Sequence, residues 1–321
     1  MATCVVYVNG HGKILVGQTE SPSEFGEEER VMVEPHNETE FDHRQDADAV
    51  AYLVGAELSE RRKRAKKTLP DAAKALGCSV AKVHNMEAGR NQQRPDEVQT
   101  LLRLYRASQV DIDRLCALAS SASGKTWWAP WTDVVPDWLR TFVGLEGLAD
   151  SAQIYAPLIL PALLQTAEYS HAATEGDPHV RPDHNDRVVA LRQERQRRVT
   201  ATESPLKLEV FIEEMALLRP IGTPDVMADQ YRHLLDLGQL PTVSLRLLPT
   251  SLGRHDAIAG RFTVLTFERS SPIAYIEMLH GAIYVQDQAQ VGGYTRAVDH
   301  LRGRALDATS TIEVIRKRLT I

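Results

Sequence analysis

The sequence is poor in residues that cross-link a chain or anchor it in a membrane. Its 321 residues include three cysteines, Cys4, Cys78 and Cys116, and none lies in a CxxC pair or at a metal-ligand spacing from histidine. We interpret them as core or surface thiols and predict no metal or cofactor. No apolar run approaches the roughly 18 residues of a membrane span, and no basic start precedes an apolar run at the N-terminus. We therefore expect a cytoplasmic protein.

Common catalytic motifs are missing as well. The sequence contains no GxSxG, no HExxH and no glycine-rich loop of the kind that holds phosphate. We interpret His255 as a loop histidine bonded to backbone, and Glu277 as part of a strand. The sequence therefore favours a protein that is not an enzyme. The residue pairs with the chemistry for acid–base catalysis are Glu213 with Glu214, His255 with Asp256, and Glu277 with His280.

Charge is distributed unevenly along the chain, whose net charge is -6. Residues 1–50 hold three basic and eleven acidic residues, whereas residues 51–120 hold thirteen basic and eight acidic ones. A basic segment within an acidic protein is expected when one part of it contacts phosphate and the rest does not. The charge pattern therefore places nucleic-acid contacts within residues 51–120.

The length and composition indicate more than one folded part. A chain of 321 residues exceeds the usual size of one domain, and 43% hydrophobic and 25% charged residues are typical of a folded protein. Residues 1–50 form an acidic extension. Its apolar runs at 5–8 and 14–16 flank a glycine-rich turn, which predicts a β-hairpin. Residues 21–48 are acidic and poor in apolar side chains, which is typical of a flexible tether.

A helix-turn-helix is predicted within a domain of residues 51–120, where helical periodicity begins near residue 48. Thr68 is suited to cap a helix, Pro70 fits its first turn, and Asp71 lies three residues after the cap. Gly77 is suited to the left-handed conformation that ends this helix, and Ser79 to cap the next one. The resulting three-residue turn joins two crossed helices, as the motif requires.

This geometry separates a packed face from a DNA-reading face. Ala73 and Leu76 of the first helix are expected to pack on Val83 and Met86 of the second. The opposite face of the second helix carries short or donor-bearing side chains, which suit a major groove. Asn85 is the sharpest candidate because its amide can pair twice with an adenine edge. The predicted DNA-binding residues are Thr68, Ser79, Ala81, Lys82, His84, Asn85, Arg90, Asn91 and Arg94.

Two cationic segments flank the helix pair. Residues 61–67 carry six basic side chains and precede the motif. A charge run is usually only a solvated face, but this one is expected to lie beside the groove-reading helix. Residues 89–94 follow that helix, and their exposed amides and two arginines are predicted to hold the DNA backbone. Lys82 is expected to read a base or to contact phosphate.

The remainder of the chain is predicted to be a mixed domain. Residues 121–133 are rich in serine and tryptophan and are interpreted as a linker. All four tryptophans lie within residues 127–138, a cluster that more often fastens a helix to a core than stacks on bases. Residues 134–321 complete the fold class: an all-α helix-turn-helix domain followed by an α+β domain with a mostly antiparallel sheet. Strands are predicted at 206–212, 243–247, 262–267 and 273–276, and helices at 161–173, 186–200, 224–237, 291–306 and 309–319.

These motifs resemble a known family along residues 52–316. Residues 54–119 are similar to the XRE-type (lambda-repressor-like) helix-turn-helix, notably at Leu76-Gly77, Ser79, Lys82-Val83 and Gly89-Arg90. The rest resembles the C-terminal domain, of uncharacterised function, of actinobacterial WhiJ-like regulators. The stretches that carry this second resemblance are Trp127-Trp128, Ile154-Tyr155-Ala156-Pro157, residues 160–169, residues 192–196, residues 214–222 and residues 248–255.

The resemblance implies a regulator of development and secondary metabolism, often encoded beside a small partner protein in a toxin–antitoxin-like pairing. Three positions depart from the family pattern. Leu69 stands where a glutamine is usual, His84-Asn85 replaces a common Ser-Arg pair, and Ala162 replaces a usual glycine. In the family the glutamine contacts phosphate or a base, so the loss of the glutamine and the arginine bears on both the affinity for DNA and the usual base preference.

The function predicted from the sequence is a sequence-specific DNA-binding transcriptional regulator. Its partner is double-stranded DNA, and a homodimer is expected because one such motif reads only a half-site. The C-terminal domain is predicted to sense a partner protein or a small effector, since occupancy can shift a DNA-binding equilibrium without chemistry. Two alternatives stay open: an antitoxin-like protein that neutralises a small partner, and an enzyme in the C-terminal domain.

Overall fold

The computed structural model describes residues 5–8, 14–17, 43–122, 126–177 and 180–319. The first forty residues form one unit and residues 41–321 a second. In the first unit, β1 (Val5–Val8) pairs antiparallel with β2 (Ile14–Gly17), which confirms the two predicted hairpin strands. The predicted turn between them and most of the predicted acidic tether lie outside the described residues.

Five helices form the region predicted to bind DNA: α1 (Ala47–Arg64), α2 (Leu69–Leu76), α3 (Val80–Glu87), α4 (Pro95–Leu104) and α5 (Gln109–Ser120). The predicted domain start at residue 51 falls inside α1. This helix begins earlier because Asp46 caps it, its side chain accepting a hydrogen bond of 2.9 Å from the Ala49 amide. Ala49 and Val50 in the first turn of α1 are buried, so the last residues of the acidic extension belong to the folded unit.

The C-terminal domain contains a six-stranded mixed sheet in the order β5-β4-β3-β6-β7-β8. The first three strands in this order pair in parallel, and β3, β6, β7 and β8 pair antiparallel. The sheet is therefore mostly antiparallel, as predicted. Its strands are β3 (Ser151–Ala156), β4 (Lys207–Glu213), β5 (Val243–Leu248), β6 (Phe262–Phe267), β7 (Ser270–Met278) and β8 (Gly281–Val285).

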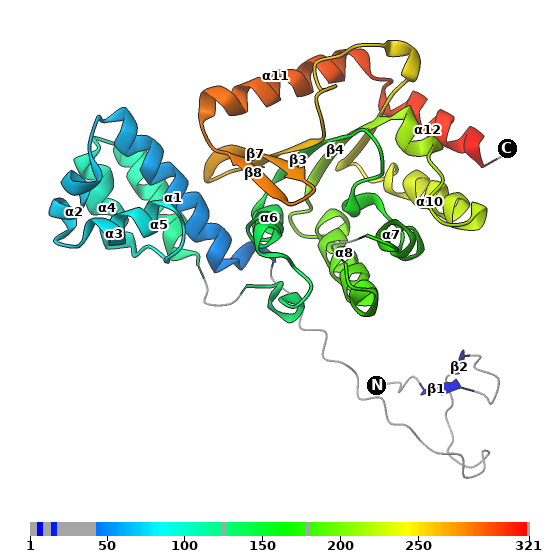
Figure 1. Cartoon of the computed structure of the whole chain (residues 1–321), viewed down its shortest axis with the longest axis horizontal. Helices are drawn as coiled ribbons and strands as arrows, with labels where there is room; N and C mark the ends of the chain where they lie inside the picture. The colour runs from blue at the N-terminus through cyan, green and yellow to red at the C-terminus, as the bar shows by residue number, and fades with distance from the viewer. Residues whose placement is uncertain (1–4, 9–13, 18–42, 123–125, 178–179, 320–321) are drawn as a thin grey trace, which may run out of the picture. The chain divides into compact units, whose positions relative to one another are not determined.

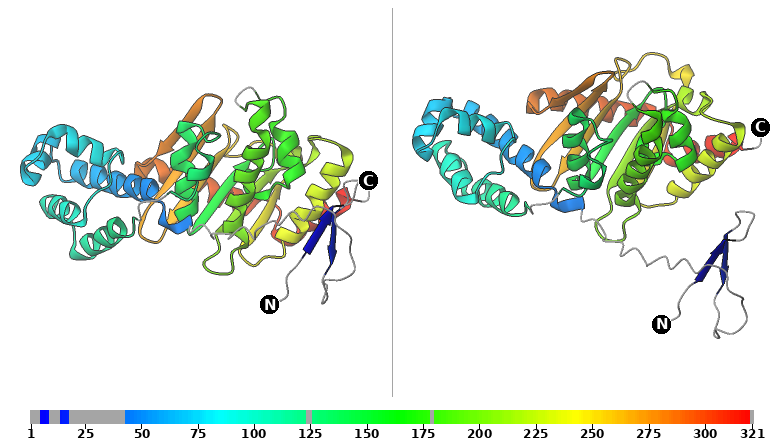
Figure 2. Two further views of the ribbon diagram at one scale, coloured as in Figure 1. Left: turned by 90° about the horizontal axis from the view of Figure 1, so that it is seen from below. Right: turned by 60° about the horizontal axis from the view of Figure 1, so that its bottom comes forward.

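Helices cover both faces of this sheet (Figure 1). On one face, α11 (Gln288–Arg304) packs on a cluster that includes Tyr155 and Phe211. The other face carries the larger core, with Ile154 and Val210 facing the opposite way from their strand neighbours. Figure 2 shows the helices of that face lying together. They are α6 (Asp137–Leu148), α7 (Ala167–Thr174), α8 (Asn185–Thr200) and α10 (Pro224–Leu237), with α12 (Ala308–Arg318) beside α10.

Most predicted elements are confirmed, with two kinds of exception. The helix predicted at 161–173 is broken into η3 (Ala162–Leu164) and α7, because Gln165 is extended and Thr166 caps a new helix. Strands β3 and β8 and helix α6 were not predicted from the sequence. The remaining short elements are η1 (His43–Gln45), η2 (Ala129–Trp131), η4 (Pro182–His184), α9 (Glu214–Leu218) and η5 (Thr250–Leu252).

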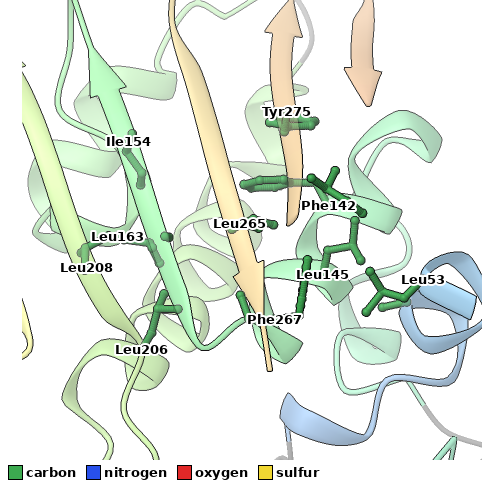
Figure 3. Close-up of a cluster of buried hydrophobic side chains, with 14 of the residues drawn as sticks. Leu53, Phe142, Leu145, Ile154, Leu163, Leu206, Leu208, Leu265, Phe267 and Tyr275 are labelled. Atoms are coloured by element: carbon green, nitrogen blue, oxygen red, sulfur yellow. The ribbon is translucent and has the colours of Figure 1, made fainter. Parts of the chain in front are cut away.

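Helix α1 belongs to both parts of the folded unit. Toward its C-terminus it packs on α3, and toward its N-terminus on α6. Glycines permit both approaches: a Cβ atom on Gly55 would lie 2.5 Å from the Met86 carbonyl oxygen, and one on Gly144 would lie 2.9 Å from Ala49 Cβ. Figure 3 shows Leu53 of α1 beside Leu145 of α6, and both belong to one continuous core cluster.

Two tryptophans of the predicted linker are buried. Trp127 and Trp128 pack with Val143 of α6 and Leu191 of α8 in a separate apolar cluster. This agrees with the expectation that they fasten a helix to a core. Among the described residues, no helix is long and apolar enough to cross a membrane.

Replacing Gly55 by Ala is expected to destabilise the protein by roughly 1–3 kcal/mol, because the added methyl meets the α3 backbone, which cannot yield as a side chain would. Urea unfolding followed by circular dichroism measures this. Gly303→Ala is the matched control, since it changes a helical glycine whose Cβ would meet nothing within 4 Å. That control should be neutral or stabilising, and equal stability of the two variants would contradict the close α1–α3 contact.

Burial raises the pKa of Asp46 to about 6. Because the folded-state pKa lies above the unfolded value of about 3.9, stability from this group is full below pH 4 and is lost as the pH rises through 6. Asp46→Asn keeps a capping oxygen and removes this loss, on the order of 2–3 kcal/mol. Urea unfolding at pH 4.5 and pH 7.5 should show the variant gaining relative to wild type at the higher pH. Asp48→Asn, an exposed first-turn change, should not, and parallel behaviour of Asp46→Asn and wild type would refute the prediction.

Candidate nucleic-acid interface

The local signals around the helix pair α2–α3 act as the sequence predicts. Thr68 and Asp71 form a capping box, in which the Thr68 hydroxyl accepts from the Asp71 amide at 3.2 Å and Asp71 accepts from the Thr68 amide at 2.8 Å. Gly77 ends α2 in the left-handed conformation with φ of 64°. Ser79 caps α3 by accepting from the Lys82 amide at 3.2 Å. The turn therefore has three residues.

The predicted packing between the two helices is also present. Ala73, Val83 and Met86 are buried, and Leu76 is half-buried against the same cluster. Gly89 then turns the chain away with φ of 66°, passing so close to α1 that a Cβ atom would lie 2.6 Å from Tyr52 Cα. The packed side of α3 is thus held on the rest of the domain, and its other side is left toward solvent.

The exposed side of α3 carries the predicted base-reading residues. Ala81, Lys82 and His84 are exposed, and Asn85 is half-buried. Val80 is 43% exposed and is not among the residues predicted from the sequence. Its position directly after the Ser79 cap was the available signal, because the first residues of a recognition helix are the ones that enter a groove.

The cations near α3 differ in what they contact. The Lys82 ammonium pairs with the Glu97 carboxylate of α4, and this pairing raises the pKa of Lys82. Arg94 holds Asp96 through two hydrogen bonds of 3.0 and 2.5 Å. Arg90 is exposed, and its side chain has no ion-pair or hydrogen-bond partner among the described residues. The first turn of α4 therefore places two carboxylates beside the predicted DNA-contacting cations.

The basic run at 61–67 is used partly inside the domain. Arg61 binds Asp111 of α5 at 2.8 and 3.2 Å. Arg62 holds Glu87 of α3 at 2.7 and 2.9 Å and also donates to the Lys67 carbonyl oxygen. These two arginines fasten helices to one another. Both are therefore engaged within the domain, and fewer of the six cations in this run are available to phosphate.

One amide of the segment at 89–94 is not exposed, which corrects the sequence-based expectation. Gln93 is buried, and its side-chain amide donates to the carbonyl oxygens of Ala51 and Met86 at 2.9 and 2.6 Å. It thereby satisfies backbone acceptors of α1 and α3 at the point where the two helices meet. Asn91 is exposed, and Gln92 is exposed and donates to the Ala122 carbonyl oxygen at 3.3 Å.

A buried carboxylate joins this domain to the sheet. Glu57 of α1 accepts from the Ser271 amide at 3.0 Å and its hydroxyl at 2.8 Å, and Arg61 and Arg114 approach it at 3.3 and 3.5 Å. Although burial alone would raise the pKa of Glu57, the Ser271 hydrogen bonds and the two arginines together lower it. Arg114 also donates to the Arg269 carbonyl oxygen at 2.5 Å. The β6–β7 turn is thus bound to α1 and α5.

Two of the residue pairs considered for catalysis meet, because His255 of one pair lies beside Glu213 of another. His255 is buried, accepts from the Ala257 amide at 3.3 Å, and lies 2.8 Å from Glu213. The backbone contact agrees with the predicted loop histidine, and the carboxylate contact was not foreseen. Glu277 lies in β7 and pairs with Arg261 at 2.9 Å. Within the described part of the chain, no three histidine, cysteine or carboxylate side chains gather where they could hold a metal ion.

Comparison with known proteins gives two matches, one for each part of the folded unit. Residues 53–115 match a helix-turn-helix domain, the region that contains α2 and α3. No curated protein and no solved structure matches the chain. Residues 139–317, more than half of the sequence, match the family described as Domain of unknown function (DUF5753). The chain therefore belongs to the DUF5753 family and carries an N-terminal helix-turn-helix domain.

Proposed function

We propose that this protein is a sequence-specific DNA-binding transcriptional regulator of the XRE type, whose C-terminal domain controls DNA binding. The observation that carries the proposal is the capped α2–turn–α3 unit within a matched helix-turn-helix domain, with the unpacked side of α3 exposed. In such units the second helix enters the major groove and the first crosses the backbone. The helix-turn-helix match supports DNA as the partner.

Each exposed residue of α3 then has a role that its chemistry allows. Asn85 reads an adenine edge, and the Val80 side chain packs on a thymine methyl group. Lys82 and Arg90 neutralise phosphates, Arg90 without having to break a contact with another described residue. The Thr68 and Ser79 caps place backbone amides at the starts of α2 and α3, where anions bind favourably. His84, Ala81, Asn91 and Arg94 complete the surface.

The C-terminal domain acts in this proposal as a sensor and not as an enzyme. Two copies of the chain are required to read both half-sites of an operator, one helical turn apart. The sensor responds to a small effector or to a partner protein, in the manner that the resemblance to actinobacterial WhiJ-like regulators implies. The site of action is the cytoplasm, where bacterial DNA lies. The Glu57–Ser271 contact supports this division of labour because it connects the two parts directly.

Asn85→Ala and Lys82→Ala should each weaken binding to a duplex selected by the purified protein from a random library, the former by about 1–3 kcal/mol. Fluorescence anisotropy with the labelled duplex measures this, and circular dichroism reports the fold. Lys207→Ala, an exposed change in β4, is the control and should bind as wild type does. Unaltered affinity in both α3 variants would remove α3 as the recognition helix.

Glu97→Gln should strengthen DNA binding a few-fold, because it releases Lys82 and removes a negative charge next to the bound phosphates. The slope of log affinity against log salt should also steepen, by up to about 0.9 if Lys82 takes one phosphate. Asp113→Asn, an exposed change in α5, serves as the matched control and should leave both quantities unchanged. Weaker binding by Glu97→Gln would show that the Lys82–Glu97 pair is itself needed in the complex.

A further inference from the structure

A cavity of about 420 Å³ lies on the larger-core face of the C-terminal sheet. Its size falls within the roughly 300–1,000 Å³ of pockets that hold drug-sized ligands. Most of its wall is apolar, and Figure 3 shows four of the lining side chains, Phe142, Ile154, Leu163 and Tyr275. The Phe142 and Tyr275 rings stack with centroids 4.0 Å apart.

Three arginines also line this cavity, and they differ in their partners. Arg195 is bound by Glu146 at 2.7 and 2.9 Å, and Arg261 lies 2.9 Å from Glu277. Arg192 donates only to neutral acceptors: Gln165 Oε1 at 3.1 Å, and Ser170 at its hydroxyl (3.0 Å) and carbonyl (3.4 Å) oxygens. Among the described residues it has no carboxylate within ion-pair distance.

The surroundings of the Arg192 guanidinium disfavour its charged form. Burial, with the neighbouring charge of Arg195 second, lowers the pKa of Arg192 to about 10. All of its hydrogen bonds use Nη1, so the donors on Nε and Nη2 have no partner among the described residues. Arg192 is half-buried and lines the cavity, where an anion would form charge-assisted hydrogen bonds with these donors.

A second polar group in the cavity also lacks a partner. The Tyr275 side chain is 3% exposed, and its hydroxyl makes no hydrogen bond among the described residues. A buried hydroxyl without a partner costs about 1–3 kcal/mol, so such groups are normally satisfied. Asp177 also lines the cavity and has a contact of its own. The cavity therefore has a mostly apolar wall. Among the described residues, this wall also carries a cation without a counter-ion and a hydroxyl group without a hydrogen-bond partner.

We infer that this cavity binds a small organic anion, an apolar molecule with one acidic group that pairs with Arg192 while a polar atom meets the Tyr275 hydroxyl. This inference rests on the proposed function, because it gives the chemical class of the effector that the C-terminal domain would sense. A small molecule fits the enclosing strands and helices better than a protein segment does, because side chains from α6, α8, β3, β6 and β7 all contribute to the wall.

Two elements of the fold connect the cavity to the DNA-binding helices. Phe142 and Glu146 of α6 line the cavity, whereas Gly144 of the same helix lies against Asp46 and Ala49 at the start of α1. Tyr275 lies in β7, and Ser271 at the beginning of that strand donates to Glu57 of α1. Two elements that wall the cavity thus contact α1, whose other end packs on α3.

The test uses the full chain and two probes that share an aromatic body. One is the anionic 8-anilinonaphthalene-1-sulfonate, and the other is the uncharged N-phenyl-1-naphthylamine. Wild type should bind both saturably at one site per chain. Arg192→Gln should weaken the anionic probe about tenfold or more and leave the uncharged probe unchanged, while Arg192→Lys restores part of the difference. Arg232→Gln, an exposed arginine of α10, is the matched control.

Val188→Trp, at a half-buried lining position of α8, should exclude both probes by filling the cavity. Cooperative urea unfolding of each variant shows that the loss is not a loss of fold. Equal affinity of wild type and Arg192→Gln for the sulfonate overturns the inference. Unsaturable binding, or binding by Val188→Trp as strong as in wild type, overturns it as well, and so does a partner protein that occupies the cavity instead.

The DNA-binding consequence is measured separately with the selected duplex. Saturating sulfonate should change the affinity of wild type for that duplex and not the affinity of Arg192→Gln. If no duplex is selected, the proposed regulator fails while the probe result still decides the binding site. If the duplex binds but the probes do not, the regulator stands and the small-anion site is rejected.

Discussion

The packing of helix α1 is the constraint on which the rest of this structure depends. Its 18 residues span about 27 Å, long enough to pack on the helical DNA-binding region and on α6 at once. Gly55 brings the middle of the helix against the α3 backbone, and Gly144 of α6 lies against its N-terminal end. Because backbone atoms cannot yield as side chains do, the Gly55 contact allows little freedom in the angle at which α1 meets α3. The helix that carries the DNA-binding region is thus also a core element of the DUF5753 domain.

The polar contacts along α1 reinforce this arrangement. Glu57 lies buried between two arginines of the helical region and Ser271 of the sheet, so removal of any partner would leave an unpaired buried charge or hydrogen-bond group. Arg62 of α1 also forms an ion pair with Glu87 of α3. A net basic segment is therefore not the same as a basic surface. Some basic residues of 51–120 form ion pairs that join helices. Two further cations, Lys82 and Arg94, pair with carboxylates of α4.

The sheet places a cavity next to this shared helix. Strand β3 is parallel to β4 on one side and antiparallel to β6 on the other, so it lies where two differently connected halves meet. Helix α6 crosses this region, with one side on the cavity and the other on α1. A ligand in the cavity can shift a DNA-binding equilibrium only if it binds the two states of the protein with different affinity. Helix α6 is an element that contacts both the cavity and α1.

The sequence by itself determined the local features of this protein. The Thr68 and Ser79 caps, the Gly77 turn and the alternating strands β4 and β5 follow from backbone chemistry and side-chain period, which act within a few residues. Only the tertiary structure decided the rest. Strand β3 contains Ser151, Ala152 and Gln153, which have little strand preference, and it forms because neighbours on both sides supply its hydrogen bonds. Likewise, the burial of Gln93, the pairing of Lys82 with Glu97 and the unmatched charge of Arg192 arise from contacts between distant segments, which composition and periodicity do not encode.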